Sequence, residues 1–215
     1  MSDRPARTIA AGDGTDGVAV AAAVAVLARG GIIAFPTETF YGLGADPVRE
    51  DAVAAIFAAK GRSAGEALPL IAADAAAARA VAASWSPIAE QLAGAFWPGP
   101  LTLVVPVRPG AVVTGVTAGR DTVAVRVPGH PLARALAGAA PGRLLTATSA
   151  NRSGSPALAT ADAVERAIGG HVSLIVDGGP SPGGLASTIV DVTGASPRLI
   201  REGPVAFDRV LEFLR

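Results

Sequence analysis

The sequence from residue 32 to residue 44 is Ile32-Ile-Ala-Phe-Pro-Thr-Glu-Thr-Phe-Tyr-Gly-Leu-Gly44. Its first four residues are continuously apolar and end at a proline, which is typical of a short strand buried on both faces. The loop that follows carries three hydroxyl groups, and its proline and glycines restrict the backbone more than a plain turn requires. Because ligand sites in α/β proteins lie where strands end, this pattern predicts a site at the end of a buried strand.

Strands and helices alternate along most of the remaining chain, with some strands adjacent to one another. The sequence predicts helices over 17–29, 50–60, 74–83, 87–95, 131–138, 161–168 and 206–214, and further strands over 68–72, 101–107, 123–127, 144–147, 172–176, 187–192 and 198–201. This order predicts an α/β fold with an open, twisted mixed sheet and flanking helices. We expect residues 1–14 to form a flexible tail and residues 15–215 to form a single domain.

The composition excludes several classes of function. Half of the 215 residues are hydrophobic, and the 18 basic and 18 acidic side chains cancel. Long-range attraction to nucleic acid or to a membrane is therefore not expected, although a local basic cleft is allowed. The absence of cysteine excludes disulfides, thiolate catalysis and cysteine metal sites. The apolar stretch 18–28 is too short to span a bilayer, and we expect a soluble, cytoplasmic protein.

Lys60 is the only lysine among the 18 basic residues. It lies in Lys60-Gly61-Arg62, directly after a predicted helix and before a loop rich in glycine and proline. A lysine ammonium is a compact point charge, which suits a phosphate oxygen. The alternative is an ordinary solvated surface cation.

Three further segments resemble the loop after Phe35 in their hydroxyl and glycine content. The segment 146–154 is a strand that runs into Thr148-Ser-Ala-Asn151, and its alternative interpretation is an Asx turn followed by a helix cap. The other two are Gly183-Gly-Leu-Ala-Ser-Thr188 and Arg201-Glu-Gly203. Because all of them follow or precede predicted strands, we expect them to meet at one site.

These segments, taken in order, resemble the YrdC-like threonylcarbamoyl-AMP synthases, in their short, single-domain form. The resemblance also includes Trp97-Pro-Gly-Pro-Leu-Thr102, Val123-Ala-Val-Arg-Val-Pro128 and Asp191, and it covers about residues 30–203. It implies an open, twisted α/β sheet around a central, positively charged cavity.

The implied reaction joins L-threonine, bicarbonate or CO₂, and ATP to give threonylcarbamoyl-AMP and pyrophosphate. In this family the product supplies the threonylcarbamoyl group for the tRNA adenosine next to the anticodon, through a separate transferase complex. The implied enzyme is thus a nucleotidyltransferase, with Mg²⁺ entering with ATP. A weak direct contact with RNA is allowed.

The substrate carbamate is itself the nucleophile, so the protein has to align two anions and neutralise the departing pyrophosphate. We assign Lys60 and Arg62 as the catalytic, phosphate-binding cations, with Arg201 beside them. The resemblance places Ser149 and Asn151 on the ATP side. It places Thr37, Thr148 and Ser187 at threonine. Among further loop residues, Tyr41 braces a loop or lines the site, and Glu38 orders its loop.

Arg126 stands on a strand between apolar neighbours, where an unpaired charge is costly. We interpret it as a bidentate clamp on the threonine carboxylate. A purely structural ion pair is the alternative.

The chain departs from the family pattern at two positions. Ser63 stands where the family has proline after Lys-x-Arg, which predicts a looser loop over residues 63–68. Ala157 stands where relatives often carry a hydroxyl, so one ATP contact is expected to be missing. We expect whatever closes the cavity to come from the loops of this domain.

Two other functions fit the same fold. One is a carbamoyl-adenylate-forming enzyme that does not use threonine. The other is a non-catalytic RNA-binding module, although zero net charge and 4% aromatic residues argue against it.

Overall fold

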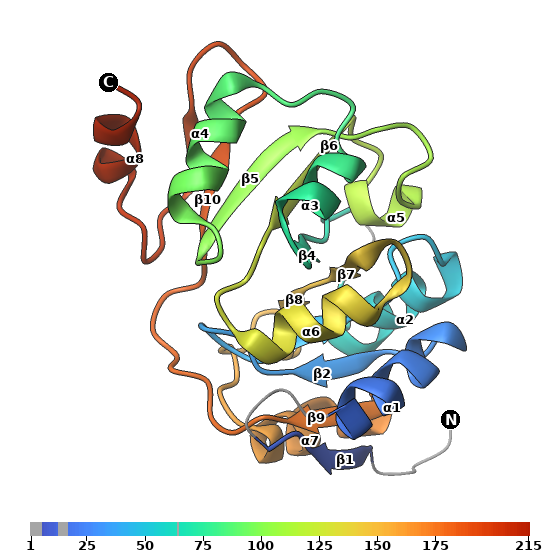
Figure 1. Cartoon of the computed structure of the whole chain (residues 1–215). Coiled ribbons are helices and arrows are strands. Elements are labelled where there is room, and N and C mark those ends of the chain that lie inside the picture. Colours follow the sequence, from blue (N-terminus) through green and yellow to red (C-terminus); the bar gives the residue numbers. More distant parts are fainter. Residues whose placement is uncertain (1–5, 13–16, 64) are drawn as a thin grey trace.

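The computed structural model describes residues 6–12, 17–63 and 65–215. Its strands form two mixed sheets flanked by helices (Figure 1), so the predicted mixed α/β class is confirmed while the strands divide between two sheets. The five-stranded sheet has the order β1 (Arg7–Ala10), β9 (Leu174–Asp177), β2 (Ile33–Phe35), β3 (Gly42–Gly44) and β8 (Thr148–Ser149). The six-stranded sheet has the order β11 (Arg198–Arg201), β10 (Thr188–Asp191), β5 (Leu101–Pro106), β6 (Thr122–Arg126), β4 (Leu70–Ala72) and β7 (Leu144–Thr146).

In the described residues, seven α-helices lie close to the ranges that the sequence predicts, and the short helix Thr114–Thr117 was not predicted. These helices are α1 (Gly17–Ala28), α2 (Glu50–Lys60), α3 (Ala75–Val81), α4 (Pro87–Phe96), α5 (Thr114–Thr117), α6 (Pro131–Ala139), α7 (Ala161–Ile168) and α8 (Phe207–Phe213). Local chemistry explains several of their ends. Asp74 and Ser86 accept hydrogen bonds from the backbone N–H groups three residues later and so cap α3 and α4. Gly61 ends α2 in the left-handed conformation, with φ of 59°, which glycine adopts without strain.

The predicted buried strand after residue 31 is confirmed as β2. Ile33 and Phe35 face one hydrophobic cluster, whereas Ile32 and Ala34 face the other. All four side chains are buried, because helices cover both faces of this strand. A strand of this kind holds the start of the next loop in a fixed place.

The prediction of a flexible tail over residues 1–14 is wrong for Arg7–Ala10. These four residues form β1, which pairs in parallel with β9 at the edge of the five-stranded sheet. The segment has no clear apolar alternation, and the open edge of β9 supplies the hydrogen bonds that make it a strand. Of the other residues in that prediction, 1–5 and 13–14 lie outside the described residues, while Ala6 and Ala11 are buried. In the described part of the chain, every helix is too short or too polar to cross a membrane.

Candidate functional site

A cavity of about 460 Å³ lies where the two sheets approach each other. Its walls come from the turn between β2 and β3, the end of α2, the segment from β8 onward, and the inner ends of β5, β6, β10 and β11. All nine predicted site residues line it: Thr37, Lys60, Arg62, Arg126, Thr148, Ser149, Asn151, Ser187 and Arg201. The predicted convergence of distant segments on one site is therefore observed.

A row of side chains across the six-stranded sheet forms one wall of the cavity. Ile189 on β10 pairs with Arg201 on β11 and with Thr102 on β5, and the antiparallel register of β5 and β6 places Thr102 opposite Arg126. Directly paired residues point to the same face of a sheet, and all four residues line the cavity. Arg126 on β6 and Arg201 on β11 therefore both reach the cavity, although their strands lie three positions apart in the order of the sheet.

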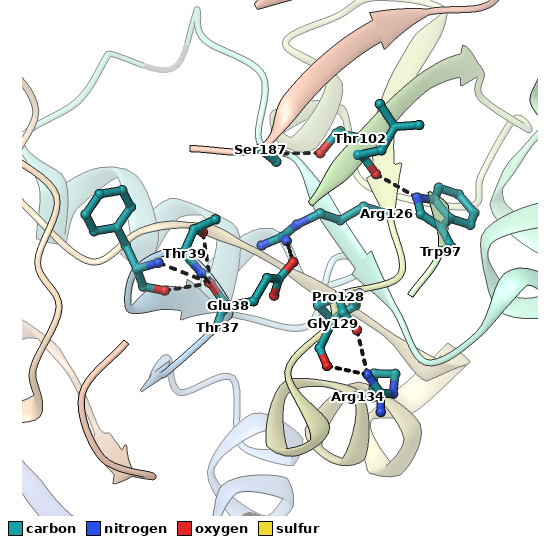
Figure 2. Close-up of polar contacts among 12 residues, drawn as sticks. Thr37, Glu38, Thr39, Trp97, Thr102, Arg126, Pro128, Gly129, Arg134 and Ser187 are labelled. Atoms are coloured by element: carbon teal, nitrogen blue, oxygen red, sulfur yellow. Dashed lines mark hydrogen bonds and ion pairs between the residues drawn. The ribbon is translucent and has the colours of Figure 1, made fainter. Parts of the chain in front are cut away.

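Arg126 forms a buried ion pair with Glu38, donating from Nη1 to Oε1. Its side chain is 9% exposed, and burial lowers the pKa of the guanidinium while Glu38 opposes that effect. The second carboxylate oxygen, Glu38 Oε2, is buried and has no hydrogen-bond partner among the described residues. In Figure 2 the Arg126 guanidinium has Glu38 on one side and the hydroxyl pair of Thr102 and Ser187 on the other. The structural ion pair considered above is therefore present in this structure, and Glu38 does hold its loop.

Arg201 braces the backbone at the start of β10. Its Nε and Nη2 donate to the Ser187 carbonyl at 3.0 and 2.8 Å, and Nη2 also lies 3.2 Å from the Ser187 hydroxyl. Partial burial and the nearby charge of Arg126 lower the pKa of Arg201. The two guanidinium groups thus repel each other across the cavity, which favours an anion between them.

Lys60 is buried, with 4% of its surface exposed, at the end of α2. Its Nζ donates to the carbonyl oxygens of Ser149 and Asn151, the latter at 2.8 Å, and lies 3.4 Å from Asn151 Oδ1. Burial, together with the charge of Arg62, lowers the pKa of Lys60 to about 8. The solvated surface cation is therefore excluded: the ammonium lies in the cavity wall and faces protein oxygens.

Arg62 lies beside Lys60 and connects three parts of the cavity. It donates to Thr148 Oγ1 and to the carbonyl of Ala67, both at 3.3 Å, and it pairs with Glu66 at 2.7 Å. Its Nε is buried without a hydrogen-bond partner in the described part of the chain. Arg62 therefore contributes positive charge to the cavity wall, while its Nε is enclosed by protein.

The hydroxyl-rich loop after β2 uses part of its polarity to hold its own shape. Thr37 Oγ1 donates to the Phe40 carbonyl at 2.7 Å and accepts from the Thr39 backbone N–H at 3.2 Å. Tyr41 is fully buried, and its hydroxyl donates to the Gly179 carbonyl at 2.8 Å. Tyr41 therefore braces a neighbouring loop and also lines the cavity, so both roles that the sequence allowed are present, while Thr37 builds a turn on the cavity wall.

The segment after β8 is held by hydrogen bonds of its own Asn151 side chain and by a bond to Lys60. The Asn151 side chain donates from Nδ2 to the carbonyls of Arg152 and Ser155, at 2.9 and 2.5 Å. The Ser153 backbone N–H donates to the Lys60 carbonyl at 2.9 Å. Ser149 is half-buried in the cavity wall. Ala157 also lines the cavity, and its methyl side chain offers no polar contact there.

The chain matches the Telomere recombination family model, which includes Sua5, YciO and YrdC, over residues 25–203. This chain belongs to that family.

Curated members of the Sua5/YciO/YrdC family are similar to the chain over most of its length. Threonylcarbamoyl-AMP synthase of Bacillus subtilis is 40% identical over 191 residues, which is 89% of this chain and 55% of the relative. A putative threonylcarbamoyl-AMP synthase of Mycobacterium tuberculosis is 37% identical over 206 residues, covering 91% of this chain and 88% of the relative. The chain thus spans about half the length of the first relative and most of the second.

A solved member of the family has the same fold. The crystal structure of Pyrococcus abyssi Sua5 complexed with L-threonine superposes with a TM-score of 0.89 and is 38% identical. The match covers 96% of this chain and 60% of the Sua5 chain. The fold is therefore that of the Sua5/YciO/YrdC family.

The structure adds residues to the cavity wall that the sequence did not single out, among them Thr102 and Glu66. Thr102 is 1% exposed and bonds Ser187, and Glu66 pairs with Arg62. The segment Trp97–Thr102 could have pointed to Thr102, because a buried hydroxyl at the start of an otherwise apolar strand needs a polar partner. In the described ranges, no group of three or more His, Cys, Asp or Glu side chains is placed to hold a metal ion.

Proposed function

We propose that this chain makes threonylcarbamoyl-AMP and pyrophosphate from L-threonine, CO₂ or bicarbonate, and ATP, as a nucleotidyltransferase. The observation that carries the proposal is the convergence of nine predicted site residues on one cavity of about 460 Å³. The names of the relatives and the Sua5 structure complexed with L-threonine support the choice of reaction.

The proposed chemistry needs no nucleophile from the protein. The threonine amine adds to CO₂, which forms a carbon–nitrogen bond and releases a proton. A carbamate oxygen then attacks the α-phosphorus of ATP, the bond from that phosphorus to the bridging oxygen breaks, and pyrophosphate leaves with the electron pair. What the protein supplies is alignment, which can contribute roughly 7–11 kcal/mol, and positive charge opposite the developing negative charge.

The cavity walls divide this work between two sides. On the sheet wall, Arg126 and Arg201 flank the place where we put the threonine carboxylate, with Ser187 between them. The sequence alone assigns Arg201 to the ATP phosphates with Lys60 and Arg62. Because Arg201 bonds Ser187 on the sheet wall, we place it at threonine instead. On the opposite wall, the charges of Arg62 and Lys60 lie beside the place of the triphosphate. Binding of threonine then requires Arg126 to share its donors between Glu38 and the substrate carboxylate.

Mg²⁺ is expected to enter with ATP. Glu66 is the carboxylate that lines the cavity in the described residues, and it is paired with Arg62. The donor set therefore fits a Mg²⁺ held by phosphate oxygens and water, the mode common for this ion in nucleotide sites. When bound, the ion would neutralise part of the triphosphate charge.

The product would pass to a separate tRNA threonylcarbamoyl-transferase complex, and a cytoplasmic location and weak RNA contact stay predictions. The reaction is tested by measuring pyrophosphate release from ATP and bicarbonate, with and without L-threonine. We expect release to depend on threonine and on bicarbonate. Release that does not depend on threonine would contradict the proposal. A carbamoyl-adenylate-forming enzyme would instead release pyrophosphate from ATP when a carbamoyl donor such as carbamoyl phosphate replaces threonine and bicarbonate. Salt-sensitive RNA binding without turnover would indicate an RNA-binding module.

A matched pair of variants ties the activity to the cavity. Arg126→Gln removes a buried charge from the sheet wall, and we expect the KM for threonine to rise roughly 30-fold, since losing one partner of a buried charge pair costs about 2 kcal/mol or more. Arg108→Gln makes the same change at an exposed position outside the cavity. It should behave like the unmodified protein.

A further inference from the structure

Thr102 and Ser187 share a hydrogen bond inside the cavity wall. Their hydroxyl oxygens are 2.9 Å apart, and the residues are 1% and 8% exposed. Either oxygen can be the donor. The bond joins the second residue of β5 to the residue just before β10, and these two residues are 85 positions apart in the chain.

Counting hydrogens shows what this pair offers to a ligand. Two hydroxyl groups carry two O–H donors, and one of these is consumed by the bond between them. Arg201 Nη2 lies 3.2 Å from the Ser187 oxygen and, as a donor, occupies one of its lone pairs. Whichever way the shared bond runs, one O–H remains. It belongs to a pair that lines the cavity together with Arg126.

Thr102 is held more rigidly than Ser187. It lies on β5, which is paired with β10 on one side and with β6 on the other. Its β-branched side chain has restricted rotation about χ1. Ser187 precedes β10 in the segment that begins with Gly183 and Gly184, both with positive φ. Thr102 is therefore the fixed member of the pair, and the serine hydroxyl takes its direction from it.

We propose that Thr102 is a positioning residue of the amino-acid site: it orients the Ser187 hydroxyl so that the pair directs one O–H donor at the substrate carboxylate beside Arg126. This inference rests on the proposed function, because it takes the carboxylate to be that of a free α-amino acid. A donor that is already oriented binds more tightly than one that must be ordered on binding.

Thr102→Val tests the proposal, because valine has nearly the shape of threonine but lacks the hydroxyl. We expect the KM for L-threonine, and its dissociation constant measured calorimetrically without ATP, to rise roughly 10-fold, the ratio for about 1.4 kcal/mol, with the KM for ATP unchanged. Thr102→Ser keeps the hydroxyl and should restore most of the affinity. Thr122→Val makes the same chemical change on β6 outside the cavity and serves as the control for strand stability.

A double-mutant cycle with Ser187→Ala separates positioning from packing. If Thr102 acts through Ser187, the double variant Thr102→Val, Ser187→Ala binds threonine no more weakly than Ser187→Ala alone. Additive losses, or a threonine affinity in Thr102→Val within about twofold of the unmodified protein, would overturn the proposal. If the unmodified protein neither binds threonine nor depends on it for activity, the proposed function fails and this inference fails with it. If the enzyme is active and Thr102→Val keeps its affinity for threonine, only this inference fails.

Discussion

Lys60 and Asn151 are joined at two points: Lys60 Nζ donates to the Asn151 backbone carbonyl at 2.8 Å and approaches the Asn151 side-chain oxygen at 3.4 Å. The Ser149 carbonyl is its third acceptor, and the Lys60 carbonyl accepts from the Ser153 N–H at 2.9 Å. One residue at the end of α2 therefore holds the segment 149–153 at both of its ends. The three ammonium hydrogens have protein acceptors, so the proposed role of Lys60 at phosphate requires an exchange of partners or action through this segment.

Lys60→Met should destabilise the protein by about 1–3 kcal/mol, because two buried carbonyl oxygens lose their donor. The free energy of unfolding is measured by urea denaturation. Lys60→Arg keeps the charge, but a planar guanidinium does not reproduce the three contacts of a compact ammonium. We expect Lys60→Arg to lose most of the threonine-dependent pyrophosphate release. Full activity of Lys60→Arg would show that charge alone matters at this position.

The lowered pKa of Lys60 predicts how stability depends on pH. Its pKa is 10.5 in an unfolded chain and about 8 in the folded protein. Between these values the unfolded state binds more protons, so the contribution of Lys60 to the free energy of unfolding rises from pH 8 to pH 10.5 and falls as the pH drops through 8. As the pH rises from 8 to 10.5, the free energy of unfolding of the unmodified protein should therefore increase relative to that of Lys60→Met. A constant difference would contradict the lowered pKa.

The ion pair between Glu38 and Arg126 predicts a large effect of removing the carboxylate. Glu38→Ala leaves Arg126 buried without its acidic partner, which costs about 3 kcal/mol for a buried pair. Thermal and urea unfolding measure this loss. Glu38→Gln keeps the shape and one acceptor oxygen, so it should lose less stability than alanine. Equal stability of all three proteins would show that water replaces Glu38 at Arg126.

Sequence patterns predicted the long elements better than the short ones. The helix α4 was placed within one residue, because Ser86 and Pro87 mark its start and its apolar face is regular. The helix α5 and the strands β1, β3 and β8 were not predicted. They have two to four residues, and none of them lies in a continuous apolar run such as the one that marks the equally short β2.

The candidate site shows the same division between local and long-range information. The residue types and their order were sufficient to bring the nine predicted residues to one cavity. Their partners were not predictable, because Arg126 and Glu38 are 88 residues apart in sequence, and Thr102 and Ser187 are 85 apart. Such pairs depend on the register of strands and on the path of loops, which a single sequence does not specify.

Tyr41→Phe tests the bracing role of the tyrosine. The hydroxyl donates to the Gly179 carbonyl at 2.8 Å and lies 3.1 Å from Asp177 Oδ1. Burial and the nearby Asp177 raise the pKa of the phenol, so it stays a donor at neutral pH. Its removal should cost about 1–2 kcal/mol in urea unfolding, since buried acceptors lose a partner, while the KM for threonine changes little. A selective rise in that KM would instead place the hydroxyl at the substrate.

Gly203→Ala should damage both stability and the threonine site. A Cβ at this buried position would lie 2.7 Å from the Ser187 carbonyl carbon, and closer still to the Ala186 carbonyl oxygen and the Thr188 nitrogen. These are backbone atoms, so the strand start that carries Ser187 must shift. We expect a loss of about 3 kcal/mol in the free energy of unfolding and a raised KM for threonine.

Gly94→Ala is the matched control for this substitution. Gly94 lies within α4, and nothing is within 4 Å of its added Cβ. Alanine there should leave the threonine KM unchanged and stabilise the helix by up to about 1 kcal/mol. If Gly203→Ala were as stable and active as Gly94→Ala, the close backbone contact after β11 would not be needed to place Ser187.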